Sequence, residues 1–495
     1  MKREVLRMER VTYKEDDVTL LRDFELNIAE GEIVGLLPLN AYGLPEFLQL
    51  LGENLPLYDG YVYYKEKLVD SWQDTGRGCG RICIIQDKSS LVGGQSVLTN
   101  IFVLRHGFRQ EIIRKRLLKR QLRPFLEEIG VDISMDILVE KLTVFERVIV
   151  EILRAVVAGY GLIVLQEIDT LISDYELEKL YEIMRYYAKK GFAFLCISPH
   201  FEELARVCER VAVMSNGKVI KVLFGEQMRA EVLIGCAKEY HVMVRRRLEG
   251  QRIKQESAKL LFEVKSLWGN YIRNLNFTVA QGECVVLQSL NEKIFLDLVS
   301  LFSGETENFS GVFYLEGKRT RLNNNREIAV IAEQPTQSML FYGMDYMDNL
   351  CFSMDHRVKG VWRSRKVKHS VEQEYRRMLG RSVFHKPLEE LTEIEKYELV
   401  YARILLQKPK IVFCIQPFKG ADLRHRIRIW ELQEMLLKKG IAVVILAVNM
   451  ADALSLADRV IRIDTDTVKT EYGKEDFGRL PVNVPWKFLY DYDIE

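Results

Sequence analysis

Hydrophobic and polar residues along this chain follow two alternating periods, which predict a regular order of strands and helices. Four short apolar runs in the first half have the length and β-branched content of buried strands. These runs are Ile33–Leu37, Ile82–Ile85, Leu162–Leu165 and Ala193–Ile197. The stretches between them carry apolar residues at helical spacing. Strands that alternate with helices are typical of a mostly parallel sheet covered by helices, so the sequence predicts an α/β fold.

The same pattern occurs twice along the chain. Gly31-Glu-Ile-Val-Gly-Leu-Leu reappears as Gly282-Glu-Cys-Val-Val-Leu-Gln, an offset of 251 residues (282 − 31). Leu142-Thr143 reappears as Leu391-Thr392, an offset of 249 residues (391 − 142). Two landmarks that keep one spacing indicate duplication of a large domain. The predicted parts are a first domain, a linker and a second domain, at 1–244, 245–257 and 258–495.

The segment after the first predicted strand has the frame of a phosphate-binding loop but few of its ligands. Such a loop joins a strand to a helix N-terminus through a glycine-rich turn, with a lysine that reaches the terminal phosphates. Here Gly35 lies in the strand, and the turn Pro38–Gly43 contains Asn40. Leu44 and Pro45 stand where the lysine and a magnesium-binding hydroxyl would follow. Since proline suits the first turn of a helix, we expect the helix to form without its phosphate ligands.

Composition narrows the class of protein further. The 495 residues are 48% hydrophobic and 28% charged, which is the balance of a globular protein with more than one core. The net charge of +1 gives no global attraction to nucleic acid, and we expect no nucleic-acid partner. No apolar run approaches the roughly 20 residues of a membrane helix. The eight cysteines lack metal-ligand spacing. We therefore expect a cytoplasmic protein, and if it works at the inner face of the cell membrane, other subunits must bring it there.

Several stretches together resemble one family, the tandem ATP-binding subunits of bacterial ABC importers for ribose and galactose. Residues 31–52 resemble its first phosphate loop, and 142–155 (Leu-Thr-Val-Phe-Glu-Arg-Val-Ile-Val-Glu-Ile-Leu-Arg-Ala) its first signature helix. Residues 162–174 and 408–422 are similar to the acidic strand of each half and the loop beyond it. The resemblance spans nearly the whole chain. It implies two tandem ABC-type nucleotide-binding domains with a P-loop NTPase-like fold, each with a helical subdomain.

The resemblance assigns roles to residues of the first half. Tyr13 matches the aromatic residue that stacks on adenine, and Gln86 the glutamine that senses the γ-phosphate and metal. Glu167 matches the general base that polarises water. The remaining positions of the implied nucleotide site belong to the phosphate loop and its strand: Gly35, Asn40 and Gly43. The resemblance also implies ATP as the cofactor and transmembrane permease subunits as partners, docked near Gln86 and Gln334.

Most other catalytic positions of the family hold different residues. Gln166 stands in place of the magnesium-supporting aspartate, and Phe145 in place of the signature glycine. Pro199 replaces the switch histidine, and His200 is one position out of register with it. In the second half, Ile415-Gln416 replaces both acids of the strand. No protein metal site is predicted.

The missing residues weaken the case for ATP chemistry. In the family each ATP lies between the phosphate loop of one half and the signature of the other, where Glu393 and Glu395 would repel the phosphates. Each lost charge-assisted phosphate contact costs about 1.5–3 kcal/mol, and about 1.4 kcal/mol is a factor of ten in affinity. We therefore predict weak or absent ATP binding, no bound Mg²⁺ and no efficient hydrolysis.

Three functional hypotheses remain open at this point. The first is a pseudo-ATPase that acts with an importer permease. The second is a slow ATPase that uses Glu167 in one site. The third is a regulatory or interaction protein that uses the ABC fold as a platform without a permease.

Overall fold

The chain forms two compact units. The computed structural model describes residues 2–69, 82–103, 115–229, 232, 259–305, 308–323, 325–354, 365–380, 382–464 and 469–480. The units consist mainly of Met1–Glu249 and of Gly250–Ala421 with His425–Val484. The predicted linker 245–257 and the boundaries beside it lie outside the described residues, so the domain limits stay a prediction.

A six-stranded, mostly parallel sheet forms the centre of the first unit, in the order β10-β9-β3-β8-β7-β6. Its strands are β3 (Ile33–Pro38), β6 (Ile82–Ile85), β7 (Leu162–Gln166), β8 (Ala193–Ile197), β9 (Arg210–Ser215) and β10 (Lys218–Phe224). Only the pair β9–β10 is antiparallel. The four predicted strands are confirmed, with β3 and β7 one residue longer than expected. Strands buried on both faces read as continuous apolar runs, which is why they could be predicted.

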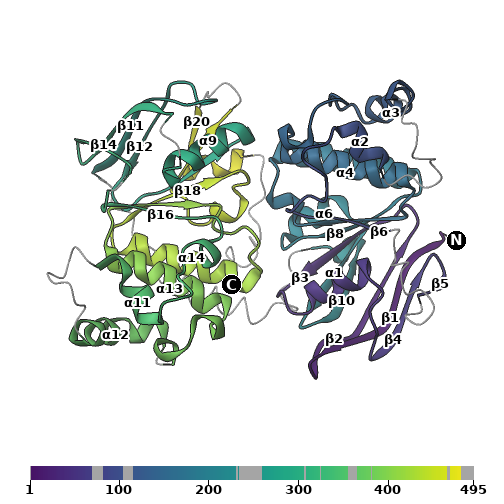
Figure 1. Ribbon diagram of the computed structural model, residues 1–495, viewed down its shortest axis with the longest axis horizontal. Helices are drawn as coiled ribbons and strands as arrows, with labels where there is room; N and C mark the ends of the chain where they lie inside the picture. The colour runs from purple at the N-terminus through teal and green to yellow at the C-terminus, as the bar shows by residue number, and fades with distance from the viewer. Residues whose placement is uncertain are drawn as a thin grey trace. The chain divides into compact units, whose positions relative to one another are not determined.

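A second, antiparallel sheet of the first unit has the order β2-β1-β4-β5. Its strands are β1 (Glu4–Glu15), β2 (Val18–Ala29), β4 (Asp59–Tyr64) and β5 (Lys67–Leu68). The helices of the unit are α1 (Leu44–Gly52), α2 (Val97–Phe102), α3 (Lys115–Ile129), α4 (Val144–Ala158), α5 (Asp174–Lys189) and α6 (Phe201–Val207), with 3-10 turns η1 (Val139–Lys141), η2 (Ile168–Thr170) and η3 (Gly225–Gln227). Figure 1 shows the six-stranded sheet between the antiparallel sheet on one side and α2, α3 and α4 on the other.

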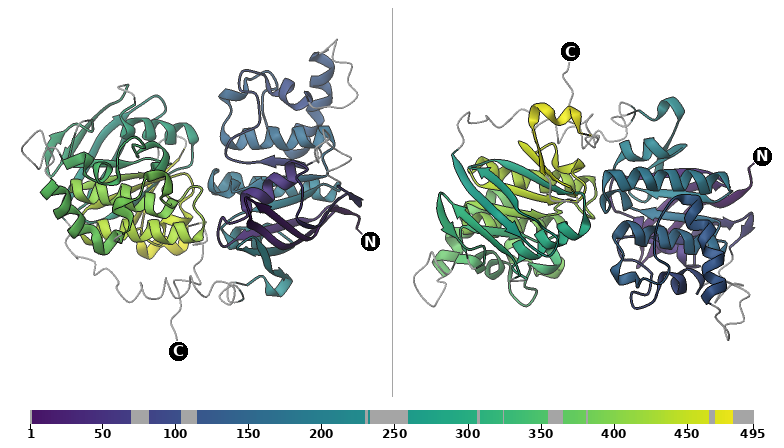
Figure 2. Two further views of the ribbon diagram at one scale, coloured as in Figure 1. Left: turned by 60° about the horizontal axis from the view of Figure 1, so that its bottom comes forward. Right: turned by 90° about the horizontal axis from the view of Figure 1, so that it is seen from above.

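The second unit repeats this plan. Figure 2 shows its strands and helices in two further views. Its central sheet has the order β16-β17-β18-β13-β19-β20, and its antiparallel sheet the order β12-β11-β14-β15. The strands are β11 (Leu260–Trp268), β12 (Leu275–Ala280), β13 (Cys284–Ser289), β14 (Ser310–Leu315), β15 (Lys318–Thr320), β16 (Ile328–Ile331), β17 (Ile411–Ile415), β18 (Ala442–Ala447), β19 (Arg459–Ile463) and β20 (Lys469–Gly473).

The helices of the second unit lie at matching places in the chain. They are α9 (Glu292–Ser303), α10 (Pro335–Ser338), α11 (Tyr346–Cys351), α12 (Arg365–Leu379), α13 (Glu393–Gln407) and α14 (Leu423–Lys438), with 3-10 turns η4 (Phe352–Met354), η5 (Val383–His385), η6 (Leu388–Glu390), η7 (Ala451–Ala453) and η8 (Lys474–Arg479).

The long helix of each helical subdomain begins in the same way. Thr143 and Glu146 form a capping box at the start of α4, in which each side chain bonds the other residue's backbone N–H. Thr392 and Glu395 form the same box at the start of α13. The duplicated Leu-Thr of the sequence is therefore a helix-start signal in both units.

A hydrophobic core lies against each face of the central sheets. In the first unit, one core joins the antiparallel sheet, β3 and α1, with the rings of Phe24 and Phe47 4.9 Å apart. In the second unit, Phe302 of α9 stacks on Phe413 of β17 at 4.0 Å. These cores hold the end of the first parallel strand, where a nucleotide loop would begin, in a fixed place in each unit.

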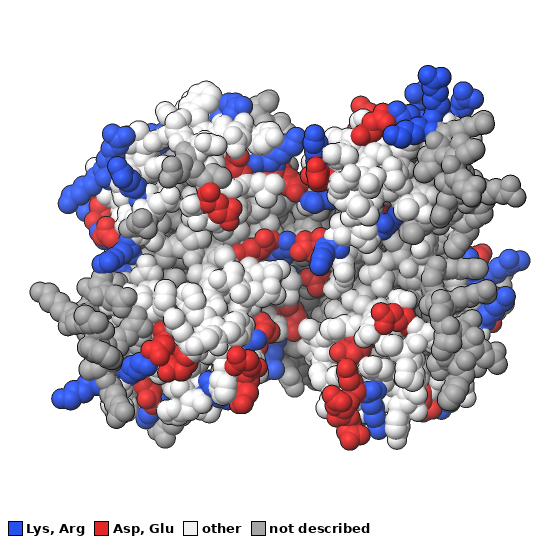
Figure 3. All heavy atoms as spheres, in the orientation of Figure 1, with Lys and Arg blue, Asp and Glu red and all other residues white. Residues whose placement is uncertain are grey.

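The helix α3 carries several lysine and arginine residues. Figure 3 shows lysine and arginine side chains gathered over this helix. The opposite face of α3 is buried through leucines that include Leu118 and Leu122. Lysine and arginine thus form a solvated face of an amphipathic helix. In the part of the chain that the structure describes, no helix is both long and apolar enough to span a bilayer.

Candidate functional site

The polar groups of the turn between β3 and α1 bond to one another and to Asn216. Asn40 Oδ1 accepts the backbone N–H groups of Tyr42 (3.3 Å) and Asn216 (3.2 Å), and Asn40 Nδ2 donates to Asn216 Oδ1 (3.1 Å). The N–H of Leu44 donates to a carbonyl of the same turn at 3.1 Å. Pro45 has no N–H. A phosphate loop binds through backbone N–H groups that point at the ligand. Tyr42, Leu44 and Pro45 therefore offer a phosphate no free amide.

Gly43 and Leu44 fix the start of α1. Gly43 has φ +79°, and a Cβ there would lie 2.4 Å from the Leu20 carbonyl oxygen and 2.9 Å from Gly217 Cα, so the backbone requires glycine. Leu44 is 6% exposed and packs in the hydrophobic core. A lysine in this position would place its ammonium group among apolar side chains, which is costly. The residues of this loop do not fit the phosphates of a nucleotide.

Two other predicted residues lie in strands. Gly35 is in the middle of β3, where a Cβ would lie 3.0 Å from Val211 Cγ2 and 3.2 Å from Cys208 Sγ. Its missing side chain therefore lets β3 pack closely against its neighbours. Tyr13 is partly buried on β1 and packs against the core of the first unit. Burial is the main cause that raises the pKa of the Tyr13 hydroxyl.

The corresponding turn of the second unit is shorter. β13 ends at Ser289 and α9 begins at Glu292, so the turn consists of residues 290 and 291. Ser289 Oγ donates to the Asn291 carbonyl (2.8 Å) and accepts the Asn291 N–H (3.3 Å). Asn291 Oδ1 in turn accepts the N–H of Lys293 (2.9 Å). A connection of this length has no room for a glycine-rich phosphate loop.

Glu167 lies in the turn after β7, in a left-handed conformation with φ 53°. Its N–H donates to the Ile197 carbonyl (2.7 Å), and its carbonyl accepts the N–H of Thr170 (3.1 Å). Gln416 of the second unit also has a positive φ, 40°, and its N–H donates to Leu446 (2.9 Å). Both units thus keep the turn, and the first alone keeps the carboxylate. Among the described residues, no group of three or more histidine, cysteine or acidic side chains could hold a metal ion.

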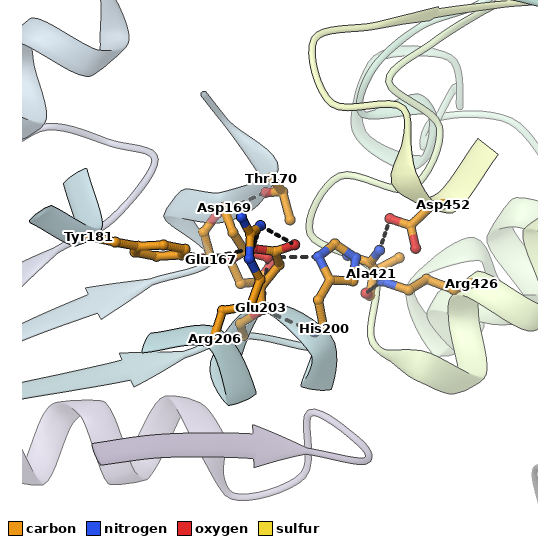
Figure 4. Close-up of polar contacts among 11 residues, drawn as sticks. Glu167, Asp169, Thr170, Tyr181, His200, Glu203, Arg206, Ala421, Arg426 and Asp452 are labelled. Atoms are coloured by element: carbon orange, nitrogen blue, oxygen red, sulfur yellow. Dashed lines mark hydrogen bonds and ion pairs between the residues drawn. The ribbon is translucent and has the colours of Figure 1, made fainter. Parts of the chain in front are cut away.

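A buried polar cluster beside this turn was not predicted from the sequence (Figure 4). Ser198 Oγ donates to Asp169 Oδ2 (2.8 Å), and His200 Nδ1 lies 2.6 Å from the same oxygen. All three residues are buried. The cluster joins the end of β7 to the end of β8. At the offset of 249 residues, the second unit has Phe418 and Ala447 in place of the aspartate and serine.

The two helices that follow these strands are also tied together by charged groups. Tyr181 of α5 donates to Glu203 Oε2 of α6 (3.0 Å), and Arg206 pairs with Glu203 (2.9 Å) and with Glu178. Burial, followed by the nearby Glu203 carboxylate, raises the pKa of Tyr181 far above its ordinary value. In the second unit, Arg426 of α14 pairs with Asp452 (Figure 4). These side chains therefore fix the segment after β8. In the family that the sequence resembles, this segment carries the switch histidine.

The acidic residues of the second signature are paired within their own unit. Glu395 Oε1 accepts from Lys386 Nζ (2.7 Å), and Glu393 accepts from Lys396 (2.7 Å). Burial raises the pKa of Glu395, but the bonds from Lys386 and Thr392 outweigh it and leave that pKa below its ordinary value. Both glutamates are thus engaged at the start of α13.

Gln86 is the first residue after β6 and Gln334 the third residue after β16, and both side chains are exposed. Beyond each glutamine, one buried asparagine holds the chain. Asn100 Oδ1 accepts the Val92 N–H (2.8 Å), and its Nδ2 donates to the Val92 carbonyl (3.1 Å). Asn349 makes the same two bonds to Phe341, both at 2.9 Å. Sequence analysis missed these asparagines, although both stand at the offset of 249 residues.

These asparagine-held segments present apolar side chains to solvent in both units. Val92 and Val103 are each 59% exposed in the first unit. Their counterparts, Phe341 and Phe352, are 38% and 40% exposed, and their rings lie 4.3 Å apart. Tyr342 and Met344 extend the surface in the second unit. We call Phe341, Tyr342, Met344 and Phe352 the aromatic surface. Exposed apolar groups that gather at one place mark an interaction site.

The chain is similar to importer proteins over nearly its whole length, although no family model matches it. A ribose import ATP-binding protein of Clostridium perfringens (strain SM101 / Type A) is 24% identical over 499 residues, covering 97% of this chain and 98% of that protein. One of Clostridium tetani is 22% identical, with 95% of each chain covered. A xylose import ATP-binding protein of Geobacillus kaustophilus is 21% identical, covering 96% of this chain and 97% of its own length.

Among solved structures, an ATP-binding cassette of an ABC transporter in its ADP conformation has a TM-score of 0.41 and 18% identity, covering 48% of this chain and 96% of that chain. A subunit of an ABC transporter complex from Clostridium perfringens has a TM-score of 0.39 and 20% identity, covering 50% of this chain and 97% of its own.

The two units share the arrangement expected of ABC-type domains in tandem: each has a mostly parallel sheet, an antiparallel sheet and a helical subdomain. More particularly, the chain is similar over nearly its whole length to ribose and xylose import ATP-binding proteins of bacteria, at 21–24% identity.

Proposed function

We propose that this chain is a pseudo-ATPase subunit of a carbohydrate importer, which docks to transmembrane permease subunits at the cytoplasmic face of the membrane. Its ATP binding is weak or absent, and it holds no resident Mg²⁺. The proposal extends to this chain what the names of its relatives say, ribose and xylose import. The proposal rests mainly on one contrast between two parts of each unit. The turns where phosphates would bind have lost their ligands, while the segments beyond Gln86 and Gln334 keep matching architecture.

The residues of the turns where phosphates would bind support the first part of the proposal, weak or absent ATP binding. The turn of the first unit has a buried Leu44 in place of a cation, and Pro45 removes an amide donor. Charge-assisted hydrogen bonds contribute about 1.5–3 kcal/mol each. The absence of two such contacts alone weakens a phosphate site by more than about a hundredfold. The transition state of phosphoryl transfer also depends on these charges, so hydrolysis suffers more than binding.

The exposed apolar residues of both units support the second part of the proposal, docking to a permease. A contiguous patch of exposed apolar side chains is typical of an interaction site. Phe341 and Phe352 are held in place by Asn349 and by their contact with each other, so the surface is preorganised. A preorganised surface lowers the entropic cost of binding.

Photo-crosslinking in the native host tests the docking proposal. The photoreactive residue p-benzoylphenylalanine replaces Val92 in one variant and Tyr342 in another. A matched control carries it at Tyr58, which is 69% exposed on the antiparallel side of the first unit. We expect positions 92 and 342 to cross-link to a polytopic membrane protein and position 58 not to do so. Cross-links to soluble proteins alone would contradict the proposal and favour the regulatory hypothesis.

A slow ATPase is the second candidate, because Glu167 is held in the turn where the family has its general base. Phosphate release from purified protein tests it directly. Our proposal predicts no release above background and no difference between the native chain and Glu167→Gln. Slow turnover that Glu167→Gln abolishes would favour the enzyme.

A further inference from the structure

Each unit buries an arginine behind its asparagine-held segment, and in the first unit this arginine shares a network with a carboxylate. Ser90 links the two charges: its N–H donates to Glu151 Oε1 (2.7 Å), and its Oγ donates to the same oxygen (3.2 Å). Arg154 donates to the Ser90 carbonyl (3.2 Å) and to Ser90 Oγ. Glu151 is 1% exposed and Arg154 8%. The buried positive charge is therefore compensated inside the unit.

The second unit keeps the arginine, but among the described residues no carboxylate pairs with it. At the offset of 249 residues, Val400 replaces Glu151, Met339 replaces Ser90 and Arg403 replaces Arg154. Arg403 is 5% exposed, and its Nη2 donates to the Met339 carbonyl. Nη1 has no hydrogen-bond partner among the described residues. Burial lowers the pKa of Arg403 to about 10, so the group is still a cation at neutral pH.

This cation lies directly behind the aromatic surface. The Arg403 guanidinium carbon is 5.7 Å from the centre of the Phe341 ring, which is itself exposed. A second cation, Lys396 Nζ, lies 5.8 Å from the Tyr342 ring and is already paired with Glu393. An uncompensated buried charge costs free energy, and a carboxylate brought to it relieves that cost.

We propose that the aromatic surface of the second unit binds a protein segment that carries apolar side chains and one acidic residue, whose carboxylate pairs with Arg403. This inference rests on the proposed docking function and specifies the chemistry of the docked segment. Phe341 moves aside as the carboxylate enters, and apolar side chains of the segment pack on Tyr342, Met344 and Phe352. The first unit binds no such acid, because Glu151 already compensates Arg154.

The two units supply the matched variants for a test. Met339→Ser with Val400→Glu grafts the network of the first unit into the second, and Met339→Ser with Val400→Gln is its uncharged control. Arg403→Met removes the cation while keeping its bulk, and Phe341→Ala disrupts the aromatic surface. The probe is a phage-displayed library of short amphipathic helical peptides, selected on the native chain. Binding is then measured for each enriched peptide on all variants.

We expect enriched peptides that bind the aromatic surface, identified by their loss on Phe341→Ala, to carry an aspartate or glutamate at one fixed position. Their affinity should fall by about tenfold or more on the graft and on Arg403→Met, and stay near the native value on the glutamine control. The graft should also unfold at a higher temperature than its control, because Arg403 gains a counter-ion.

Peptides that depend on Phe341 but bind the graft and the control equally would overturn the role of Arg403 and leave the docking surface standing. A graft no more heat-stable than its control would also contradict the inference. The absence of any peptide that depends on Phe341 would count against the docking surface itself, and thus against the proposed function.

Discussion

The two units differ in the turns that follow β3 and β13, but they agree in the segments that follow β6 and β16. The two turns share little: one has five residues tied together by Asn40, and the other is two residues long. The two segments are nearly superimposable in their bonding, with Asn100 and Asn349 each holding the residue eight positions earlier through both its N–H and its carbonyl.

This difference shows that a phosphate-binding turn and a docking segment make different demands on the sequence of a duplicated domain. A phosphate site requires particular donors, and once they are absent the turn needs only to connect a strand to a helix. A docking segment requires a shape, and one buried asparagine that satisfies several backbone groups provides it. On the proposed function, the molecule combines degenerate nucleotide turns with intact segments for contact with a partner.

The largest expected effect comes from Asn349→Ala. It removes the acceptor of the Phe341 N–H and the donor to the Phe341 carbonyl in a fully buried place. Unsatisfied buried groups cost about 1–3 kcal/mol each, so we expect the segment to lose about 3 kcal/mol of local stability. Hydrogen exchange at the Phe341 amide should accelerate by about a hundredfold. Asn323→Ala, at an exposed asparagine, is the control. Equal hydrogen exchange at the Phe341 amide in both variants would show that Asn349 does not hold this segment.

Asp169→Ala should have a smaller but distinct effect on the first unit. It removes a buried carboxylate oxygen that accepts from Ser198 and contacts His200. We expect the free energy of unfolding of this unit to fall by about 2 kcal/mol, as measured with denaturant. Asp132→Ala, at an exposed aspartate, should change it by less than about 0.5 kcal/mol. An unchanged free energy of unfolding in Asp169→Ala would mean that the cluster does not hold β7 and β8 together.

The base of β3 supplies a pH-dependent prediction. Burial raises the pKa of Glu32, but the bonds from Arg210 and from the Ala29 N–H outweigh it, so that pKa lies below its ordinary value. A carboxyl with a lowered pKa in the folded state stabilises the protein above its unfolded pKa of about 4.3, and this contribution is lost as pH falls through the folded value.

Glu32→Gln should therefore cost about 1.5 kcal/mol at neutral pH, and the cost should shrink as the pH falls below about 4. Denaturant unfolding across this range measures the difference. Glu25→Gln, at an exposed position on β2, should cost little at any pH. A cost that stays constant down to pH 3 would contradict the assigned charge interaction.

The sequence predicted the frame of the fold well because the central strands are buried on both faces. Ile82–Ile85 and Ala193–Ile197 were located to the residue, since a short, continuous apolar run is typical of a strand that is buried on both faces. The start of α1 was also predicted correctly, because Gly43 and Pro45 are local signals whose meaning does not depend on distant residues.

The features that depend on distant residues could not be predicted. Asp169 and His200 are brought together only because β7 and β8 are neighbours in the sheet. The uncompensated charge of Arg403 becomes visible only when its surroundings are compared with those of Arg154. The roles assigned to Tyr13 and to Glu167 by resemblance remain predictions, because position alone does not test them.

Calorimetric titration of the purified chain with ATP, with and without Mg²⁺, tests the central claim most directly. Our account predicts no saturable binding below millimolar ATP and no effect of Mg²⁺, because Leu44 replaces the lysine, Pro45 has no N–H, and the N–H groups of Tyr42 and Leu44 are bonded within the turn. Micromolar binding that Mg²⁺ strengthens would contradict the account, since it would require a working phosphate site in this molecule.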